Sequence, residues 1–126
     1  MNDHSKSCQV CHPQEYTIWE KSLHAAAFTE LKKKNKDKTA DCLRCHTVSF
    51  GKPNGFVSEK KTPMLAAVQC ESCHGIGSIH VNAPPNQKRT TIERSRGAAT
   101  CLICHDRDND PNFNYAKAMA KIKHWK

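Results

Sequence analysis

The chain has 126 residues, a mean hydropathy of −0.74 and only 6% aromatic residues, so its own side chains offer little apolar material for a core. A formal charge of +8 and a pI near 9.2 would suit a nucleic-acid or anionic-membrane binder. However, no aromatic and basic nucleic-acid module accompanies the lysines, and no segment is long enough to span a bilayer. We therefore expect neither a nucleic-acid partner nor an integral membrane segment.

The predicted elements are short helices joined by loops. Apolar residues at three- and four-residue steps predict an amphipathic helix over residues 13–34, which ends in a lysine-rich run at 32–38. One role for these lysines is a favourable interaction between their positive charges and the dipole at the helix C-terminus. The alternative role is docking of an acidic redox partner. Residues 47–61 predict a loop, residues 63–75 a short helix that stops at a glycine, and residues 112–125 a final helix.

Four copies of one short motif use all eight cysteines of the chain. In each copy, two cysteines are separated by two residues and followed at once by a histidine. This is the attachment signature of c-type haem, in which the thiols bond the porphyrin vinyl groups and the histidine ligates the iron. The copies are Cys8, Cys11 and His12; Cys42, Cys45 and His46; Cys70, Cys73 and His74; and Cys101, Cys104 and His105. The sequence therefore predicts four covalently attached haem c groups.

Other uses of paired cysteines fit this pattern less well. Zinc ribbons and thioredoxin-like redox sites also contain cysteines two residues apart, but neither requires a histidine directly after the second cysteine. A disulfide framework gives no reason for four identical spacings.

The four haems also predict the fold. With about thirty residues for each haem, the chain is too short to build a conventional core around each one. We expect one tetrahaem cytochrome c domain over residues 1–126, mainly α with extensive loops, with stacked haems as its core and little or no β-sheet. Without haem, the polypeptide should not fold.

Four histidines lie outside the motifs, which is the number needed to give every iron a second ligand: His4, His24, His80 and His124. We predict four bis-histidine haems, with low-spin iron at comparatively low potential and no vacant site for a substrate. Methionine is the competing ligand, but Met64 and Met119 fall in apolar helical patterns, so we assign them to the core.

Geometry limits the pairing of these ligands. If the helix over 13–34 is continuous, His24 lies about 16–18 Å along its axis from His12. Two imidazole nitrogens on one iron are only about 4 Å apart, so His24 should serve the haem of a later motif. His80 follows His74 by six residues and would have to wrap around the porphyrin edge to reach the same iron. A different haem is preferred for His80 as well.

Three segments resemble the cytochrome c554-type group of multihaem cytochromes. Tyr16 to His24 matches the group's Tyr-x-x-Trp-x-x-Ser-x-His pattern, and Cys70 to His80 matches Cys-x-x-Cys-His-Gly-x-Gly-x-x-His. The tail from Phe113 to His124 resembles the group's closing Phe-x-Tyr and Ile-x-His element.

The resemblance implies distal-ligand roles for His24, His80 and His124, with His80 serving the first haem. It also implies haems stacked in parallel and perpendicular pairs, and a role in electron transfer. His4 has no counterpart in the group's pattern. It either completes a remaining haem, or is a tail residue, or completes a haem of a neighbouring subunit in a filament.

We predict an electron carrier that relays single electrons between donor and acceptor redox proteins and is not an enzyme. The alternatives are a reductase of a small nitrogen compound with one open haem site, or a subunit of an extracellular conductive filament that self-associates through His4. Covalent haem attachment takes place outside the cytoplasmic membrane, which predicts a periplasmic, cell-surface or extracellular location. No secretory signal is present, so we expect the chain to be a mature form.

Overall fold

The structure is a computed structural model that describes residues 4–93 and 97–124. Within these ranges the chain is mainly helical, has long loops and contains no β-strand, which confirms the predicted fold class. No helix in the described part has the length and apolar character needed to cross a membrane. The helices are α1 (Lys6–Gln9), α2 (Pro13–Glu20), α3 (Ala27–Lys33), α4 (Ala40–His46), α5 (Cys70–His74), α6 (Ser78–Asn82), α7 (Ala98–Leu102) and α8 (Tyr115–Ile122), with single 3-10 helices η1 (Pro63–Leu65) and η2 (Pro85–Thr90).

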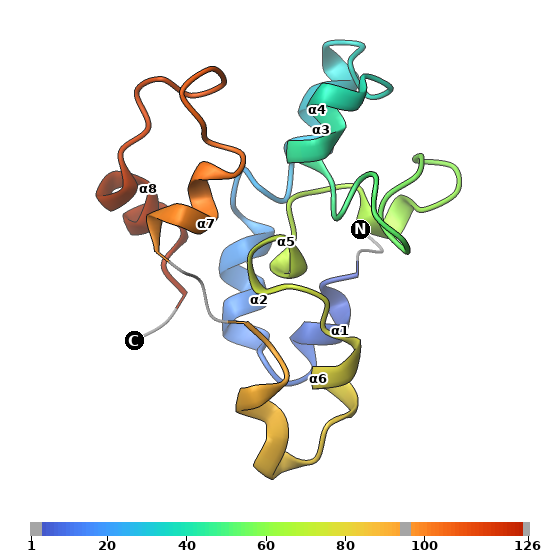
Figure 1. Cartoon of the computed structure of the whole chain (residues 1–126), viewed down its shortest axis with the longest axis vertical. Coiled ribbons are helices and arrows are strands. Elements are labelled where there is room, and N and C mark those ends of the chain that lie inside the picture. Colours follow the sequence, from blue (N-terminus) through green and yellow to red (C-terminus); the bar gives the residue numbers. More distant parts are fainter. Residues whose placement is uncertain (1–3, 94–96, 125–126) are drawn as a thin grey trace.

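The helices form small groups around a central helix. Figure 1 shows α2 near the middle of the molecule, α3 and α4 together at the top, and α7 and α8 at one side. The α6 helix and η2 form the lower end, and α1 packs against α2. Helices α1, α4, α5 and α7 each contain at least one cysteine of a different motif, so the four motifs belong to four separate parts of the fold.

The prediction of one continuous helix over 13–34 is wrong, because the chain turns between α2 and α3. The Ser22 hydroxyl donates to the Trp19 carbonyl at 2.6 Å, and the Val68 N–H donates to the His24 carbonyl at 3.1 Å. A continuous helix would need both carbonyls for its own ladder. The Ser22 hydroxyl therefore occupies a carbonyl at the end of the first helix, and the His24 carbonyl accepts from both Ala27 and the distant Val68.

The buried apolar side chains gather around α3, α4 and the loop that follows them. This cluster consists of Phe28, Leu31, Leu43, Val48, Phe56 and Leu65. In contrast, residues 70–93 and 97–124 contain no buried apolar side chain. Met64, which was predicted to be in the core, has 36% of its surface exposed, and Leu23 has 84%. The part of the chain from the third motif onward therefore has no apolar core made by its own side chains.

The loop after the second motif folds back on itself, as predicted for residues 47–61. The Phe56 N–H donates to the Val48 carbonyl at 2.8 Å. A Cβ atom at Gly55 would lie 1.8 Å from the Ser49 carbonyl oxygen, so only glycine fits this close approach. The loop thereby delivers Phe56 and Val48 to the apolar cluster.

The final helix is shorter than the predicted 112–125. Helix α8 begins at Tyr115 because the Asn114 side chain caps it by accepting the Lys117 N–H at 2.9 Å. It ends at Ile122, and Trp125 lies outside the described residues.

Replacing Phe28 by alanine should destabilise the protein by about 3–5 kcal/mol, because it leaves a cavity in the single apolar cluster of the described chain. The Phe28 ring is 4% exposed and its centre lies 5.5 Å from that of Phe56. Denaturant unfolding of the haem-loaded protein, followed by far-ultraviolet circular dichroism, measures the loss. Val57→Ala is the control, since Val57 is 57% exposed and should change stability by less than about 0.5 kcal/mol. Equal effects of the two changes would contradict a packed cluster.

Candidate haem sites

Each cysteine motif folds as a turn of helix. Helix α5 is the whole third motif, and Gly75, with a φ of 78°, ends it where the sequence predicted. In the first motif the His12 N–H donates to the Cys8 carbonyl at 2.8 Å, and in the fourth the His105 N–H donates to the Cys101 carbonyl at 2.9 Å. Residues three and four apart share one face of a helix, so each motif presents two thiols and an imidazole on one side.

The eight cysteines form no disulfide, and thiols of different motifs approach each other in two places. Cys8 and Cys70 are joined by a hydrogen bond, which raises the pKa of Cys8 and lowers the pKa of Cys70 to about 6. Burial raises the pKa of Cys104, and the nearby Cys45 thiol, which is hydrogen-bonded to Cys104, raises it further, to about 12. The first motif therefore lies against the third, and the second against the fourth.

Two imidazoles from outside the motifs face motif histidines. The ring centres of His24 and His105 are 6.1 Å apart, with an interplanar angle of 45°. Those of His74 and His124 are also 6.1 Å apart, with an angle of 83°. Two imidazoles on opposite sides of one iron have their nitrogens about 4 Å apart and their ring centres about 6 Å apart. Both pairs have the spacing that a bis-histidine iron needs.

Most of the histidines are held through the same nitrogen. In five of them Nδ1 is hydrogen-bonded to an oxygen: His46 to the Ala27 carbonyl at 3.0 Å, His74 to the Glu93 carbonyl at 2.8 Å, His80 to the Lys88 carbonyl at 2.8 Å, His105 to Asp110 Oδ2 at 2.9 Å, and His124 to the Ile122 carbonyl at 2.9 Å. A carbonyl oxygen can only accept, so Nδ1 must carry the proton wherever a carbonyl is the partner. Nε2 then keeps its lone pair, the form in which a histidine binds iron.

The remaining histidines differ in their surroundings. Burial, followed by the nearby His105 and His46 rings, lowers the pKa of His24 and keeps its imidazole neutral, as a metal ligand must be. Nδ1 of His4 meets the Glu71 carboxylate. His12 Nδ1 lies 3.7 Å from Glu15 Oε2, a buried oxygen that has no hydrogen-bond partner.

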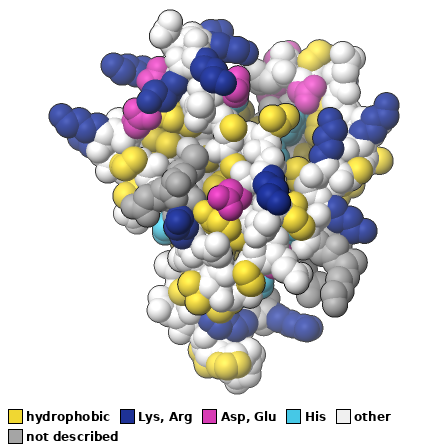
Figure 2. Space-filling view, turned by 180° about the vertical axis from the view of Figure 1, so that it is seen from behind, with side chains coloured by type: hydrophobic (Ala, Val, Ile, Leu, Met, Phe, Trp, Pro, Cys, Tyr) yellow, Lys and Arg dark blue, Asp and Glu magenta, His cyan; other side chains and the backbone are white. Residues whose placement is uncertain are grey.

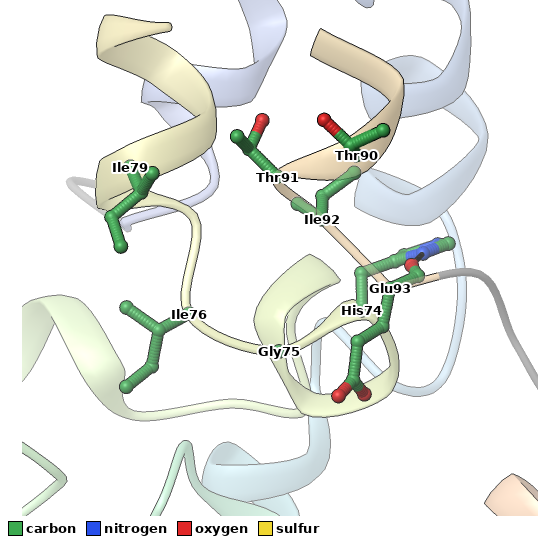
Figure 3. A pocket seen from close by; sticks show the side chains of 8 residues that line it. All are labelled: His74, Gly75, Ile76, Ile79, Thr90, Thr91, Ile92 and Glu93. Atoms are coloured by element: carbon green, nitrogen blue, oxygen red, sulfur yellow. Dashed lines mark hydrogen bonds between the residues drawn. The ribbon is translucent and has the colours of Figure 1, made fainter. Parts of the chain in front are cut away.

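An open cleft of about 410 Å³ lies beside the third motif. Figure 3 shows Ile76 and Ile79 on one side of this cleft and His74 and Glu93 on the other. The two isoleucines are 66% and 71% exposed, which is unusual for side chains so apolar. They offer an apolar wall next to an imidazole, as the face of a porphyrin requires.

The motif residues thus fit covalently attached haem. The structure places two of the four predicted distal histidines beside motif histidines. His24 and His124 lie beside motif histidines. In the described chain, no ring contact joins His12 or His46 to another imidazole, and none involves His4 or His80. The described residues also contain no cluster of three or more His, Cys, Asp or Glu side chains arranged to hold a bare metal ion, as a zinc site would need.

Two carboxylates at these sites were not found by sequence reasoning. Asp110 accepts from His105, and Glu71 holds His4. Asp110 follows its histidine by five residues, and Glu71 lies inside the third motif. An acidic residue inside or just after a haem-attachment motif was the available signal for both.

Helical motifs with paired thiols, imidazoles at bis-histidine spacing and a fold without a sufficient apolar core define a multihaem c-type cytochrome. This class binds haem iron and serves in electron transport. Residues 7–75 match the family model described as cytochrome c554 and c-prime, and the chain belongs to that family.

Two curated relatives support the same assignment. The chain is 37% identical over 87 residues to cytochrome c-554 of Nitrosomonas europaea, an alignment that covers 57% of this chain and 37% of the relative. It is 33% identical over 90 residues to the multiheme cytochrome MtrA of Shewanella baltica, covering 61% of this chain and 26% of the relative. The chain therefore spans only about a quarter to two fifths of the length of these relatives. No solved structure matches it.

The prediction that the protein is not an enzyme is corrected. It assumed that two imidazoles close every iron, but in the described chain no ring contact joins His12 or His46 to another imidazole. The match to cytochrome c-554 establishes the class of cofactor over part of that relative and does not exclude catalysis. The exclusion of enzymatic activity is therefore withdrawn.

Replacing Asp110 by asparagine should raise the midpoint potential of one haem. The carboxylate accepts the His105 Nδ1 proton at 2.9 Å and makes this ligand more basic, which favours ferric iron. A tenfold loss of that preference corresponds to an upward shift of about 60 mV in a spectroelectrochemical titration. Asp108→Asn makes the same charge change at an exposed position and should leave the potentials unchanged. Identical titration curves for the two variants would show that Asp110 does not act through His105.

Proposed function

We propose that the protein is an electron carrier with four covalently attached haem c groups in one domain over residues 1–126. It relays single electrons between redox partner proteins. The four motif histidines are the proximal ligands, and His4, His24, His80 and His124 are the distal ligands.

The single observation that carries this proposal is the pairing of imidazoles at one spacing. His24 with His105 and His74 with His124 each combine a motif histidine with one from outside the motifs, and both pairs have ring centres 6.1 Å apart. Packing alone gives no reason for two such pairs to share the spacing of axial ligands.

The residues of the chain would prepare the haems for electron transfer. Bound haem supplies a one-electron iron couple. The Nδ1 hydrogen bonds hold each imidazole in one tautomer and orientation, so the ligands need not rearrange when an electron arrives. The contacts between Cys8 and Cys70, and between Cys45 and Cys104, join the attachment points of different motifs. The haem edges bonded there would lie close enough to pass electrons within the molecule.

Partners and location follow from charge and from the chemistry of attachment. Each ferric haem with ionised propionates contributes roughly −1, which would bring the oxidised protein to about +4 from its formal +8. Figure 2 shows lysine and arginine side chains scattered over one face and not gathered into one patch. Lys32 and Lys33 of the lysine-rich run pair with Glu59 and Glu30 at 2.9 and 3.2 Å. We propose donor and acceptor redox proteins as partners, in the periplasm or at the cell exterior.

A reductase of a small nitrogen compound is the second candidate function. The observation that favours it is that no ring contact in the described chain joins His12 or His46 to another imidazole. An iron with one open position there would bind carbon monoxide or nitrite. A filament subunit would need His4 to reach a neighbouring chain, whereas its Nδ1 contact with Glu71 favours a role within the same chain. Sizing of the native protein separates a carrier from a filament.

Replacing His24 or His124 by alanine should leave one iron of four with a single imidazole. The wild-type protein should carry the mass of four haems and show only low-spin ferric iron by electron paramagnetic resonance. Each variant should keep four haems and show high-spin iron at about one quarter of the total, with carbon monoxide binding at the same fraction.

Leu23→Ala is the control for this experiment, because Leu23 is next to His24 in the sequence and 84% exposed. It should remain fully low-spin. A wild-type protein with fewer than four haems would refute the proposed cofactor content. Low-spin spectra in both histidine variants would refute the proposed ligand pairs.

A further inference from the structure

Glu71 lies inside the third cysteine motif, between Cys70 and Cys73, and its carboxylate is nearly buried. Only 11% of the side chain is exposed. Both oxygens are used by donors from elsewhere in the chain: Oε1 meets His4 Nδ1, and Oε2 accepts the Gly77 N–H at 2.7 Å. A motif for covalent attachment needs only two thiols and an imidazole, so these contacts are not explained by haem attachment.

Each contact of Glu71 leads to a histidine outside the motifs. His4 is held directly through Nδ1, which leaves its Nε2 free. Gly77 immediately precedes α6, the helix that carries His80, and a bond to its N–H fixes where that helix begins. His80 Nδ1 is in turn bonded to the Lys88 carbonyl, so its Nε2 is free as well.

The contacts of the other histidines indicate which motif histidines His4 and His80 serve. His24 and His124 make ring contacts with His105 and His74, so within the described residues His12 and His46 are the motif histidines that no ring contact pairs with a second imidazole. His4 and His80 are the two remaining imidazoles that can complete them.

The backbone places His4 beside the second motif. The His4 N–H donates to the Met64 carbonyl at 2.9 Å, and the Val48 N–H donates to the Leu65 carbonyl at 3.1 Å. Val48 follows His46 by only two residues. His4 and Val48, just after the second motif, are therefore hydrogen-bonded to the same two-residue segment, Met64 and Leu65.

We propose that Glu71 is a positioning residue for two distal ligands: it holds His4 for the iron of His46 and sets α6 so that His80 serves the iron of His12. The inference rests on the proposed function, since it assumes haem at all four motifs. A carboxylate that accepts from Nδ1 orients the imidazole and makes Nε2 a stronger ligand. The third motif thus organises the distal side of two haems that it does not itself attach.

The test compares Glu71→Ala and Glu71→Gln in the haem-loaded protein. Alanine removes both acceptors, so high-spin ferric iron should rise from none to about half of the total, which is two irons of four. Glutamine keeps an acceptor oxygen for only one of the two donors, so the high-spin fraction should be about one quarter. Added imidazole should restore the low-spin spectrum in both variants, whereas it would not repair a general loss of structure.

Two further variants make the outcome decisive. Glu59→Gln makes the same charge change as Glu71→Gln at a surface ion pair with Lys32 and should stay fully low-spin. His4→Ala, near the chain terminus, should give one quarter high-spin iron, and adding Glu71→Ala to it should give no more than Glu71→Ala alone. If Glu71→Ala fails to retain four haems, Glu71→Gln and His4→Ala decide.

The possible failures are distinguishable. A Glu71→Ala protein with four haems and a wild-type low-spin spectrum overturns the role of Glu71 and leaves the proposed function intact. A wild-type protein that lacks haem at the first or second motif, or is already high-spin at two irons, overturns the ligand assignment in the proposed function and this inference with it.

Discussion

The hydrogen bond from a histidine Nδ1 to an oxygen of the protein is the interaction on which the sites depend. It recurs at His46, His74, His80, His105 and His124 with partners at 2.8–3.0 Å. In each case it holds the ring in one orientation and leaves Nε2 as the nitrogen that can bind iron. Since most acceptors are main-chain carbonyls, the backbone fold itself decides where the imidazoles point.

A second constraint is the shortage of apolar side chains. The cluster around Phe28 and Leu43 serves α3, α4 and the following loop, while the described residues after Gln69 bury no apolar side chain of their own. Exposed residues such as Ile76, Ile79 and Ile103 have 66–72% of their surface open in the polypeptide. Porphyrin faces would cover such side chains and supply the missing core, so the cofactor would have a structural as well as a redox role.

Sequence reasoning succeeded where the chemistry is local. The spacing of cysteines and histidines identified the motifs, because covalent attachment demands those residues in one turn of helix. The small number of residues for each haem predicted the helical class, and three longer segments carried the resemblance to the family. It failed for the helix over 13–34, since the Val68 N–H that takes the His24 carbonyl lies 44 residues along the chain. No pattern in the neighbouring sequence predicts such a hydrogen bond. The partner of Glu71 was missed for the same reason, since His4 lies 67 residues away, whereas Asp110 lies only five residues after its partner His105.

Buried hydrogen bonds connect distant segments of this chain. In other proteins, apolar packing has this role. Ser5 and Gln69 are only 2% and 3% exposed, and the Gln69 side-chain oxygen accepts from the Ser5 N–H at 3.0 Å and its hydroxyl at 3.1 Å. The Gln69 amide then donates to the Met64 carbonyl at 2.7 Å, and the Trp19 indole donates to the Val68 carbonyl at 2.6 Å.

These bonds connect Ser5 and α2 to one segment, residues 64–70, which leads into the third motif. Hydrogen bonds are directional, and a buried donor or acceptor left without its partner is costly, so they specify one arrangement more strictly than apolar contact can. Axial ligation also requires one strictly specified arrangement, because an imidazole displaced by an ångström no longer reaches its iron. A chain that must set imidazoles from distant segments against its motif histidines therefore gains more from a few buried polar contacts than from a larger apolar core.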